Sequence, residues 1–154
     1  MIRVQEEDFD VGAEIDGLAG DDHGVGAIVT FIGLVRDINS GDAVADMTLE
    51  HYPGMTERML DRIEAEAMER WPLSASLIVH RYGQLAPGDR IVLVITASAH
   101  RQAAFEASEF LVDWLKTKAP FWKKEGTPDG ARWVTARRSD DAAAARWAKA
   151  PPDR

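Results

Sequence analysis

The sequence of 154 residues contains no cysteine. Disulfides, thiolate metal sites, cysteine nucleophiles and any sulfur carried on the protein itself are therefore excluded. No apolar run reaches the roughly 18–20 residues that a membrane-spanning helix needs, and the N-terminus has neither the basic nor the apolar region of a signal peptide. The sequence thus predicts a cytoplasmic protein without a membrane partner.

Several catalytic motifs are missing as well. The sequence has no Gly-rich phosphate loop, no dinucleotide fingerprint and no Gly-x-Ser-x-Gly elbow. Its four histidines, at positions 23, 51, 80 and 100, are scattered and form no His-x-x-x-His metal pair. We therefore predict a site without metal and without an organic cofactor, built from lysine, arginine and histidine.

The charge is distributed unevenly along the chain. The net charge is -8, but residues 114–138 contain seven basic and two acidic side chains and have a local charge of +5. The overall charge argues against nucleic-acid and anionic-membrane partners, and a basic region in an acidic protein favours a small anion or a carboxylate. The alternative is a solvent-exposed run of loop lysines with no binding role.

Hydrophobic periodicity predicts both strands and helices. The length fits one domain covering residues 1–154. Apolar or alternating runs predict strands at 25–36, 43–52, 75–82, 90–96 and 132–136. Helical spacing predicts helices at 55–71, over about 17 residues after 98, and at 139–149, with a loop at 121–130. We expect the second strand to form a hairpin with the first, in an α+β domain with a mostly antiparallel sheet.

The segment Lys116-Thr-Lys-Ala-Pro-Phe-Trp-Lys-Lys124 is the strongest candidate for a functional site. It places Lys116 at the end of a predicted helix and Lys123 just past a Pro-Phe-Trp corner, so both side chains could meet in one pocket with an aromatic wall. Desolvation and a neighbouring like charge lower the pKa of a lysine and make it an acid, a base or an amine nucleophile at neutral pH. The alternative is that Phe121 and Trp122 are core anchors and the lysines extend past them into solvent.

Other basic residues are candidates for contacts with an anion. Ser98 is predicted to cap a helix, which puts His100 and Arg101 in its first turn, where backbone N–H groups favour an anion. Arg36 ends a strand beside a Gly-containing loop, where a cation can face a ligand. Each has a structural alternative, since a histidine often only completes hydrogen bonds and a strand-end arginine is often simply exposed. The remaining polar rings within strands are interpreted as structural: His51, Tyr52 and His80.

Five ordered blocks of the sequence resemble one protein family. They are Gly26–Arg36, Leu49–Met55, the His80-Arg81-x-Gly83 strand end with Pro87–Asp89, Ser98–Arg101 and Lys116–Lys123. Their order and spacing are similar to those of the large, catalytic subunit of molybdopterin synthase, the MoaE family, from about residue 3 to residue 147. The sequence departs from the family pattern after Arg36, where Asp37-Ile-Asn39 replaces a more basic stretch.

The resemblance implies an α/β hammerhead fold and a dimer of these subunits. It also implies one small ubiquitin-like carrier subunit (MoaD-like) at each end of the dimer, which makes a heterotetramer. The C-terminal Gly-Gly thiocarboxylate of the carrier donates sulfur to cyclic pyranopterin monophosphate, and two rounds complete the dithiolene of molybdopterin. In that family the residues matching Lys116 and Lys123 are catalytic. Other residues of the family line the pocket for the anionic substrate, and they match Arg36, His100, Arg101 and Arg137. The residue matching Arg137 reaches this pocket from the other subunit of the dimer.

The chemistry of the residues agrees with this implied activity. The phosphate of the substrate and the thiocarboxylate of the carrier are both anions, and both require cations and N–H donors. Because the chain has no cysteine, the sulfur has to arrive on another molecule. Two alternatives remain: a non-catalytic docking module for the carrier, and a regulator that binds a small anion or nucleotide through the same basic region. The lysine pair favours the enzyme.

Overall fold

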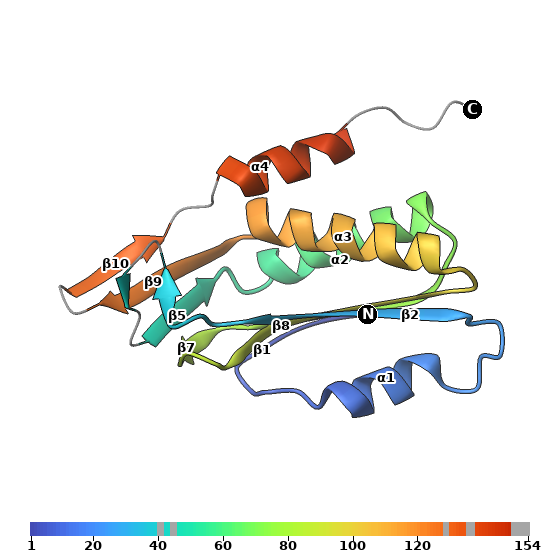
Figure 1. Ribbon diagram of the computed structural model, residues 1–154, viewed down its shortest axis with the longest axis horizontal. Helices are drawn as coiled ribbons and strands as arrows, with labels where there is room; N and C mark the ends of the chain where they lie inside the picture. The colour runs from blue at the N-terminus through green and yellow to red at the C-terminus, as the bar shows by residue number, and fades with distance from the viewer. Residues whose placement is uncertain (40–41, 44–45, 128–129, 135–137, 149–154) are drawn as a thin grey trace.

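The computed structural model of the chain describes residues 1–39, 42–43, 46–127, 130–134 and 138–148 (Figure 1). Along these residues the elements are β1 (Ile2–Gln5), α1 (Val11–Ala19), β2 (Ala27–Leu34), β3 (Ile38–Asn39), β4 (Asp42–Ala43), β5 (Asp46–His51), α2 (Met55–Arg70), β6 (Leu73–Arg81), β7 (Gly83–Leu85), β8 (Arg90–Ser98), α3 (Arg101–Thr117), β9 (Phe121–Thr127), β10 (Gly130–Val134) and α4 (Arg138–Ala145), followed by a 3-10 turn (Arg146–Ala148).

The strands form two four-stranded sheets and one short ribbon. The central sheet has the order β1-β6-β8-β2, in which β1 and β6 are parallel and the other neighbours are antiparallel. The distal sheet has the order β10-β9-β5-β7 and is antiparallel throughout, while β3 and β4 pair with each other. The prediction of an α+β fold with mostly antiparallel strands is confirmed.

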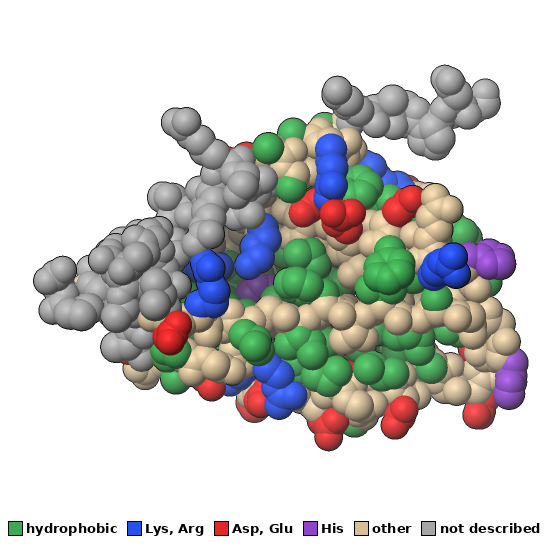
Figure 2. Space-filling view, in the orientation of Figure 1, with side chains coloured by type: hydrophobic (Ala, Val, Ile, Leu, Met, Phe, Trp, Pro, Cys, Tyr) green, Lys and Arg blue, Asp and Glu red, His purple; other side chains and the backbone are tan. Residues whose placement is uncertain are grey.

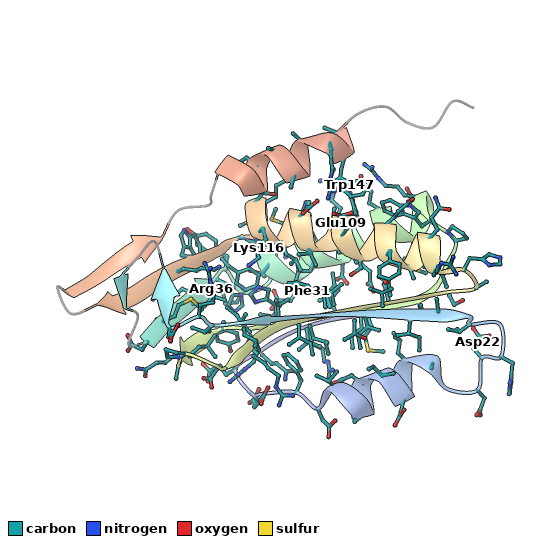
Figure 3. The ribbon with its side chains drawn as sticks, in the orientation of Figure 1. Asp22, Phe31, Arg36, Glu109, Lys116 and Trp147 are labelled. Carbon is teal, nitrogen blue, oxygen red and sulfur yellow. The ribbon has the colours of Figure 1, made fainter. Side chains whose placement is uncertain are left out.

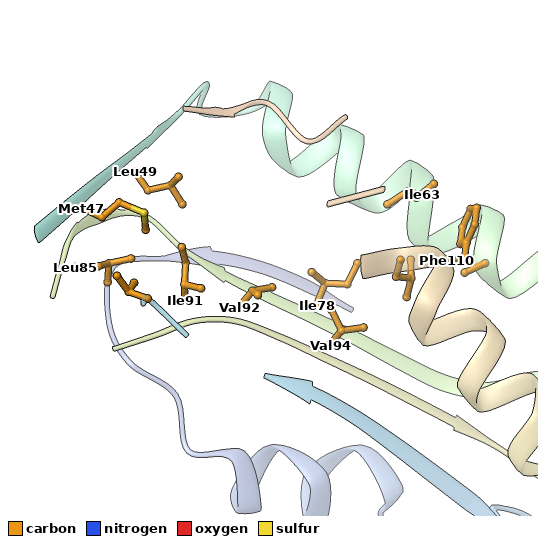
Figure 4. Packing of buried hydrophobic residues seen from close by; sticks show 12 residues of the cluster. Met47, Leu49, Ile63, Ile78, Leu85, Ile91, Val92, Val94 and Phe110 are labelled. Carbon is orange, nitrogen blue, oxygen red and sulfur yellow. The ribbon is translucent and has the colours of Figure 1, made fainter. Parts of the chain in front are cut away.

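Helices cover both faces of the central sheet (Figure 1). α1 packs on one face, over buried Leu77 of β6 and Leu93 of β8. α2 and α3 pack on the other face, over Ile78 and Val94 (Figure 4). Because successive strand residues point to opposite faces, the central part of β6 and most of β8 are buried on both sides, and their buried runs Leu77–Val79 and Ile91–Ile95 are apolar. None of the helices in the described residues is long and apolar enough to cross a membrane.

The C-terminal end of α3 lies where the central and distal sheets meet (Figure 1). Small residues on the buried side of the helix let it pack closely on β8, where the Thr96 hydroxyl donates a hydrogen bond to the Ala104 carbonyl at 2.7 Å. Only residues 118–120 separate the end of α3 from the start of β9. The helix therefore places Lys116 next to the distal sheet.

Two predictions about the strands are wrong. The segment 43–52 contains β5, but β5 pairs with β7 and β9 rather than forming a hairpin with β2. β2 instead pairs along its length with β8. The segment 121–130, expected to be a loop, is largely β9, whose backbone pairs with both β5 and β10. These pairings join residues far apart in the sequence, and such contacts override the weak local strand propensity of a stretch rich in lysine and glycine.

The predicted helices are present with shifted ends. α2 and α3 have nearly the predicted lengths, but His100 rather than Ser98 occupies the N-cap position of α3. Ser98 is the last residue of β8, and its hydroxyl donates to the Pro72 carbonyl at 2.8 Å. α4 ends at Ala145 and gives way to a 3-10 turn. β1 and α1, the latter capped by the Asp10 carboxylate, were not predicted from the acidic N-terminal segment.

Candidate functional site

The two candidate lysines lie on different elements that meet where α3 ends. Lys116 is in the last turn of α3 and is exposed, whereas Lys123 is in β9 and is half-buried. Lys123 lies opposite Leu49 of β5, and Leu49 is fully buried. Opposed residues of an antiparallel pair project from the same face of a sheet, so Lys123 extends from the inner face of the distal sheet.

The buried imidazole of His80 lies close to both lysine charges. His80 alternates with Ile78 on the α2/α3 side of β6 and is 7% exposed. The pKa of His80 is lowered from 6.5 to about 3, chiefly by burial and to a smaller extent by the positive charges of Lys123 and Lys116, against the opposing effect of a hydrogen bond to the Arg81 carbonyl. The charges of both lysines therefore act on one ring, which is neutral at physiological pH.

Aromatic rings from separate strands line the inner side of this site. Phe121 stacks on His80 with ring centroids 3.8 Å apart and an interplanar angle of 16°. Phe121 also lies 6.0 Å from His51, and His51 lies 4.5 Å from Tyr82, both measured between ring centroids. The Thr56 hydroxyl donates its hydrogen to the Tyr52 carbonyl. It therefore accepts a hydrogen bond from His51 Nδ1, 3.1 Å away. The rings form a packed wall beside the lysines.

The Pro-Phe-Trp corner is divided between the two faces of the distal sheet. Phe121 faces inward, but Trp122 projects from the opposite face, is 37% exposed and packs edge-on against Tyr52 at 4.2 Å between centroids. Successive strand residues alternate in this way. The predicted aromatic wall is thus made by Phe121 with His80 and His51, and Trp122 belongs to the outer surface.

Arg36 follows β2 at the same end of the molecule as Lys116 (Figure 3). It is exposed and lines an open pocket with Leu34, Val35, Asp37, Pro87 and Gly88. The Val35 amide donates to the Asp89 carbonyl at 2.9 Å, and the Gly88 amide donates to the Val35 carbonyl at 2.7 Å. Val35 is buried in the same cluster as Leu49, so the start of this loop is anchored next to the distal sheet.

The other candidate cations are not at this end. His100 and Arg101 are exposed at the start of α3. Arg101 and Lys116 lie near opposite ends of one helix and, at 1.5 Å per residue, are about 22 Å apart along its axis. Arg137 lies outside the described residues. One subunit therefore brings together Lys116, Lys123 and, at the same end, Arg36, but not His100 or Arg101.

Exposed apolar side chains lie between the basic residues beside the distal sheet and those at the start of α3 (Figure 2). Figure 2 shows hydrophobic groups on the face in view, between basic side chains beside the distal sheet and others at the start of α3. β2 is an edge strand of the central sheet, and two of its apolar side chains, Ile32 and Leu34, are 39% and 56% exposed. Phe105 of α3 is 60% exposed. An edge strand flanked by exposed apolar groups is typical of a protein–protein contact.

The chemistry of the site is that of anion binding. Among the described residues no group of histidine and carboxylate side chains could hold a metal ion. The charged groups near the buried imidazole are two lysine ammonium groups, and ammonium groups bind phosphates and carboxylates through charge-assisted hydrogen bonds. The fold is that of an α+β protein whose candidate site, at the junction of two sheets, is built on two lysines.

Comparison with known proteins identifies the family. The family model described as MoaE protein matches residues 4–118, and the chain belongs to this family. The chain is 58% identical over 146 residues to the molybdopterin synthase catalytic subunits of Ralstonia nicotianae and Pseudomonas aeruginosa. These matches cover 95% of this chain, 83% of the first relative and 97% of the second. The resemblance noted from the sequence blocks is confirmed.

Solved structures agree with this membership. The molybdopterin biosynthesis MoaE protein from Burkholderia ambifaria has a TM-score of 0.83 and 54% identity, with 97% of this chain and 99% of that chain covered. A molybdopterin synthase structure from Staphylococcus aureus has a TM-score of 0.79 and 32% identity, with 86% and 95% covered. The arrangement of two sheets and covering helices is therefore that of the family.

His80 and His51, interpreted as structural because each lies within a strand, are hydrogen-bonded within the fold, but their position beside the two lysines was not predicted. His80 follows the continuously apolar residues Leu77–Val79, and a polar ring at the end of such a run was the one available signal. Nothing local to that strand indicates that Phe121, some forty residues later, stacks on the ring.

Proposed function

We propose that this chain is the catalytic subunit of a molybdopterin synthase, transferring sulfur from the C-terminal thiocarboxylate of a small ubiquitin-like carrier to cyclic pyranopterin monophosphate. The relatives named molybdopterin synthase catalytic subunit, at 58% identity over 95% of this chain, support this activity. The structural observation that carries the proposal is that Lys116, in the last turn of α3, and Lys123, on the inner face of β9, lie where the two sheets meet, and that both charges act on the buried ring of His80. Because the chain has no cysteine, the carrier supplies the sulfur.

The lysine pair supplies the charge that this reaction requires. The pterin phosphate and the thiocarboxylate are both anions, and two ammonium groups offset the repulsion between them. Lys116, exposed at the end of α3, acts at the reacting carbon as a proton shuttle or transient amine partner. Lys123, projecting from the inner face of the distal sheet, stabilises the developing negative charge and orients the thiocarboxylate. The rings beside them lower the local dielectric and strengthen these interactions.

A second copy of the chain completes the substrate pocket in this proposal. His100 and Arg101 cannot reach Lys116 of their own subunit, since about 22 Å of α3 separates them. A twofold contact along the β2 edge sets equivalent elements antiparallel, so the start of one α3 can approach the end of the other. His100 and Arg101 would then contact the substrate held at the partner's lysines, and the family resemblance adds Arg137 to the residues that bind this substrate.

The carrier reaches each site from outside the dimer. Its Gly-Gly tail is an extended peptide and needs an open approach to the lysines. The pocket lined by Arg36, at the same end of the molecule as Lys116, is the approach that we propose. Two carriers on one dimer make the heterotetramer.

Mass spectrometry of the pterin tests the activity. The protein is mixed with a thiocarboxylated carrier and cyclic pyranopterin monophosphate, and the incorporation of two sulfur atoms into the pterin is followed. K116A is expected to abolish the product while carrier binding persists. K118A is the matched control, because Lys118 is an exposed lysine at the C-cap of the same helix and should leave product formation unchanged.

Two results would contradict the proposal. Wild-type product formation by K116A would remove Lys116 from the reaction. Carrier binding by the wild-type protein without any sulfur transfer would indicate the docking module instead.

A further inference from the structure

We propose that His80 is a positioning residue for this reaction: by stacking on Phe121 it holds the start of β9 against the central sheet and so places Lys123 beside Lys116. The catalytic consequence of this inference rests on the proposed function, but the positioning itself can be measured without it. His80 acts through Phe121 and the backbone of β9, not on the substrate.

The His80 ring is held by its strand and by its burial. β6 is an interior strand, hydrogen-bonded to β1 and β8, and His80 lies opposite Val4 on one side and Val92 on the other. His80 Nδ1 lies 2.9 Å from the Arg81 carbonyl oxygen. A carbonyl only accepts, so Nδ1 carries the proton and the ring plane is held by the backbone of its own strand. With 7% exposure, the ring has little room to turn.

The stacking contact between His80 and Phe121 restricts the position of β9, which carries Lys123. Phe121 is the first residue of β9 and lies on the same face as Lys123 because strand residues two apart share a face. The stack, 3.8 Å between centroids and 16° between planes, therefore fixes the end of β9 from which Lys123 projects. Phe121 also lies between Lys116 and Lys123 in the sequence, at the end of the short connection from α3. Holding Phe121 thus sets the relative position of both lysines.

A neutral imidazole suits this position. A charged ring beside two ammonium groups would add a third positive charge and would have to be desolvated under Phe121. Burial and the lysine charges hold the pKa of His80 at about 3, so the ring stacks without that cost. The same low pKa means that His80 does not accept a proton near neutral pH, which separates positioning from general base catalysis.

Three variants test the inference. H80A removes the stack, H80F keeps a ring that can stack on Phe121 but removes both nitrogens, and V79A is the matched control. Val79 is the preceding residue of β6, is fully buried and faces α1, so its truncation disturbs the same strand without touching the lysine site. Limited labelling with an amine-reactive reagent and mass spectrometry reports the reactivity of Lys123 relative to exposed Lys118 in each protein.

In the wild type we expect Lys123 to be labelled more slowly than Lys118, since Lys123 is half-buried and Lys118 is exposed. H80A should reduce this protection by about threefold or more, whereas H80F and V79A should keep it. In the sulfur-transfer assay H80A should lower kcat by about tenfold or more, because small displacements of catalytic groups can cost up to about 100-fold. H80F should restore most of kcat, and the KM for the carrier should stay near its wild-type value in all three variants.

Either of two results overturns the inference: H80A with wild-type protection of Lys123, or H80F with full protection but a kcat as low as that of H80A. The second result would mean that an imidazole nitrogen, not the stack, is what the reaction needs. Absence of sulfur transfer by the wild-type protein, with the expected labelling pattern, would instead reject the proposed function and leave the positioning of Lys123 by His80 standing.

Discussion

Burial of His80 makes the free energy of unfolding of this protein depend on pH. The substitution H80F should remove this part of the pH dependence. The folded protein holds the pKa of His80 at about 3, whereas an unfolded chain returns it to 6.5. Between these values the unfolded state binds one more proton than the folded state, so the free energy of unfolding rises with pH. The stabilisation is complete above pH 6.5 and is lost as the pH falls toward 3.

The magnitude follows from the same two values. Each pH unit across this range changes the free energy of unfolding by about 1.4 kcal/mol for one proton, so about 2.5 kcal/mol is lost between pH 7.5 and pH 4.5. H80F has no titrating group at this position and should not lose this amount. Other groups with lowered pKa values, such as the Asp8 carboxyl beside Arg90, are common to both proteins and cancel in the comparison.

Urea denaturation of wild type and H80F at pH 7.5, 6.5, 5.5 and 4.5 measures this difference. Both proteins are kept at one concentration, because any self-association would make stability depend on it. H23Q is the control, since it also removes a histidine, but one that is exposed. Parallel pH dependence of wild type and H80F would refute the reasoning, because it would mean that His80 titrates alike in the folded and unfolded states.

Two further substitutions test the packing that surrounds the site. W147F keeps a ring against the α2/α3 surface but removes the indole N–H, which donates to Asp113 at 2.6 Å; we expect a loss of about 1–2 kcal/mol by urea denaturation. G26A should destabilise by about 1–3 kcal/mol or more, because its Cβ would lie 2.2 Å from the Ala99 carbonyl oxygen. G17A, at a position in α1 with nothing within 4 Å of the new methyl, should stabilise by about 0.5–1 kcal/mol, and equal effects of the two glycine substitutions would contradict this reading.

The helices and the central strands could be predicted because their signals are local. α2 ends just before Trp71-Pro72, since proline disfavours the helical region at the residue before it. The apolar runs of β6 and β8 reflect burial on both faces of the central sheet. β9 could not be predicted in the same way, since its lysines and glycine have low strand propensity and its order comes from pairing with β5 and β10.

Some features of the candidate site could likewise be predicted from local sequence, and others depend on contacts between distant segments. The placement of Lys116 at a helix end and of Lys123 shortly after it was predictable, because they are close in sequence and a proline between them ends the helix. The separation of Arg101 from Lys116 also follows from helix geometry once α3 is established. The place of His80 in the site did not follow from any local pattern, because its partner Phe121 lies on a strand of the other sheet.

The sequence by itself determined the chemistry available to this protein: no sulfur of its own, a basic region with two lysines near a helix end, and the blocks that mark its family. Composition and short-range spacing carry that information because they do not depend on how distant segments pack. Only the tertiary structure decided which groups face one another, since strand pairing and ring stacking join β5, β6 and β9 across long separations in the chain. That packing turns His80, an isolated histidine in the sequence, into a buried, neutral ring that stacks on Phe121 and is affected by the charges of both lysines.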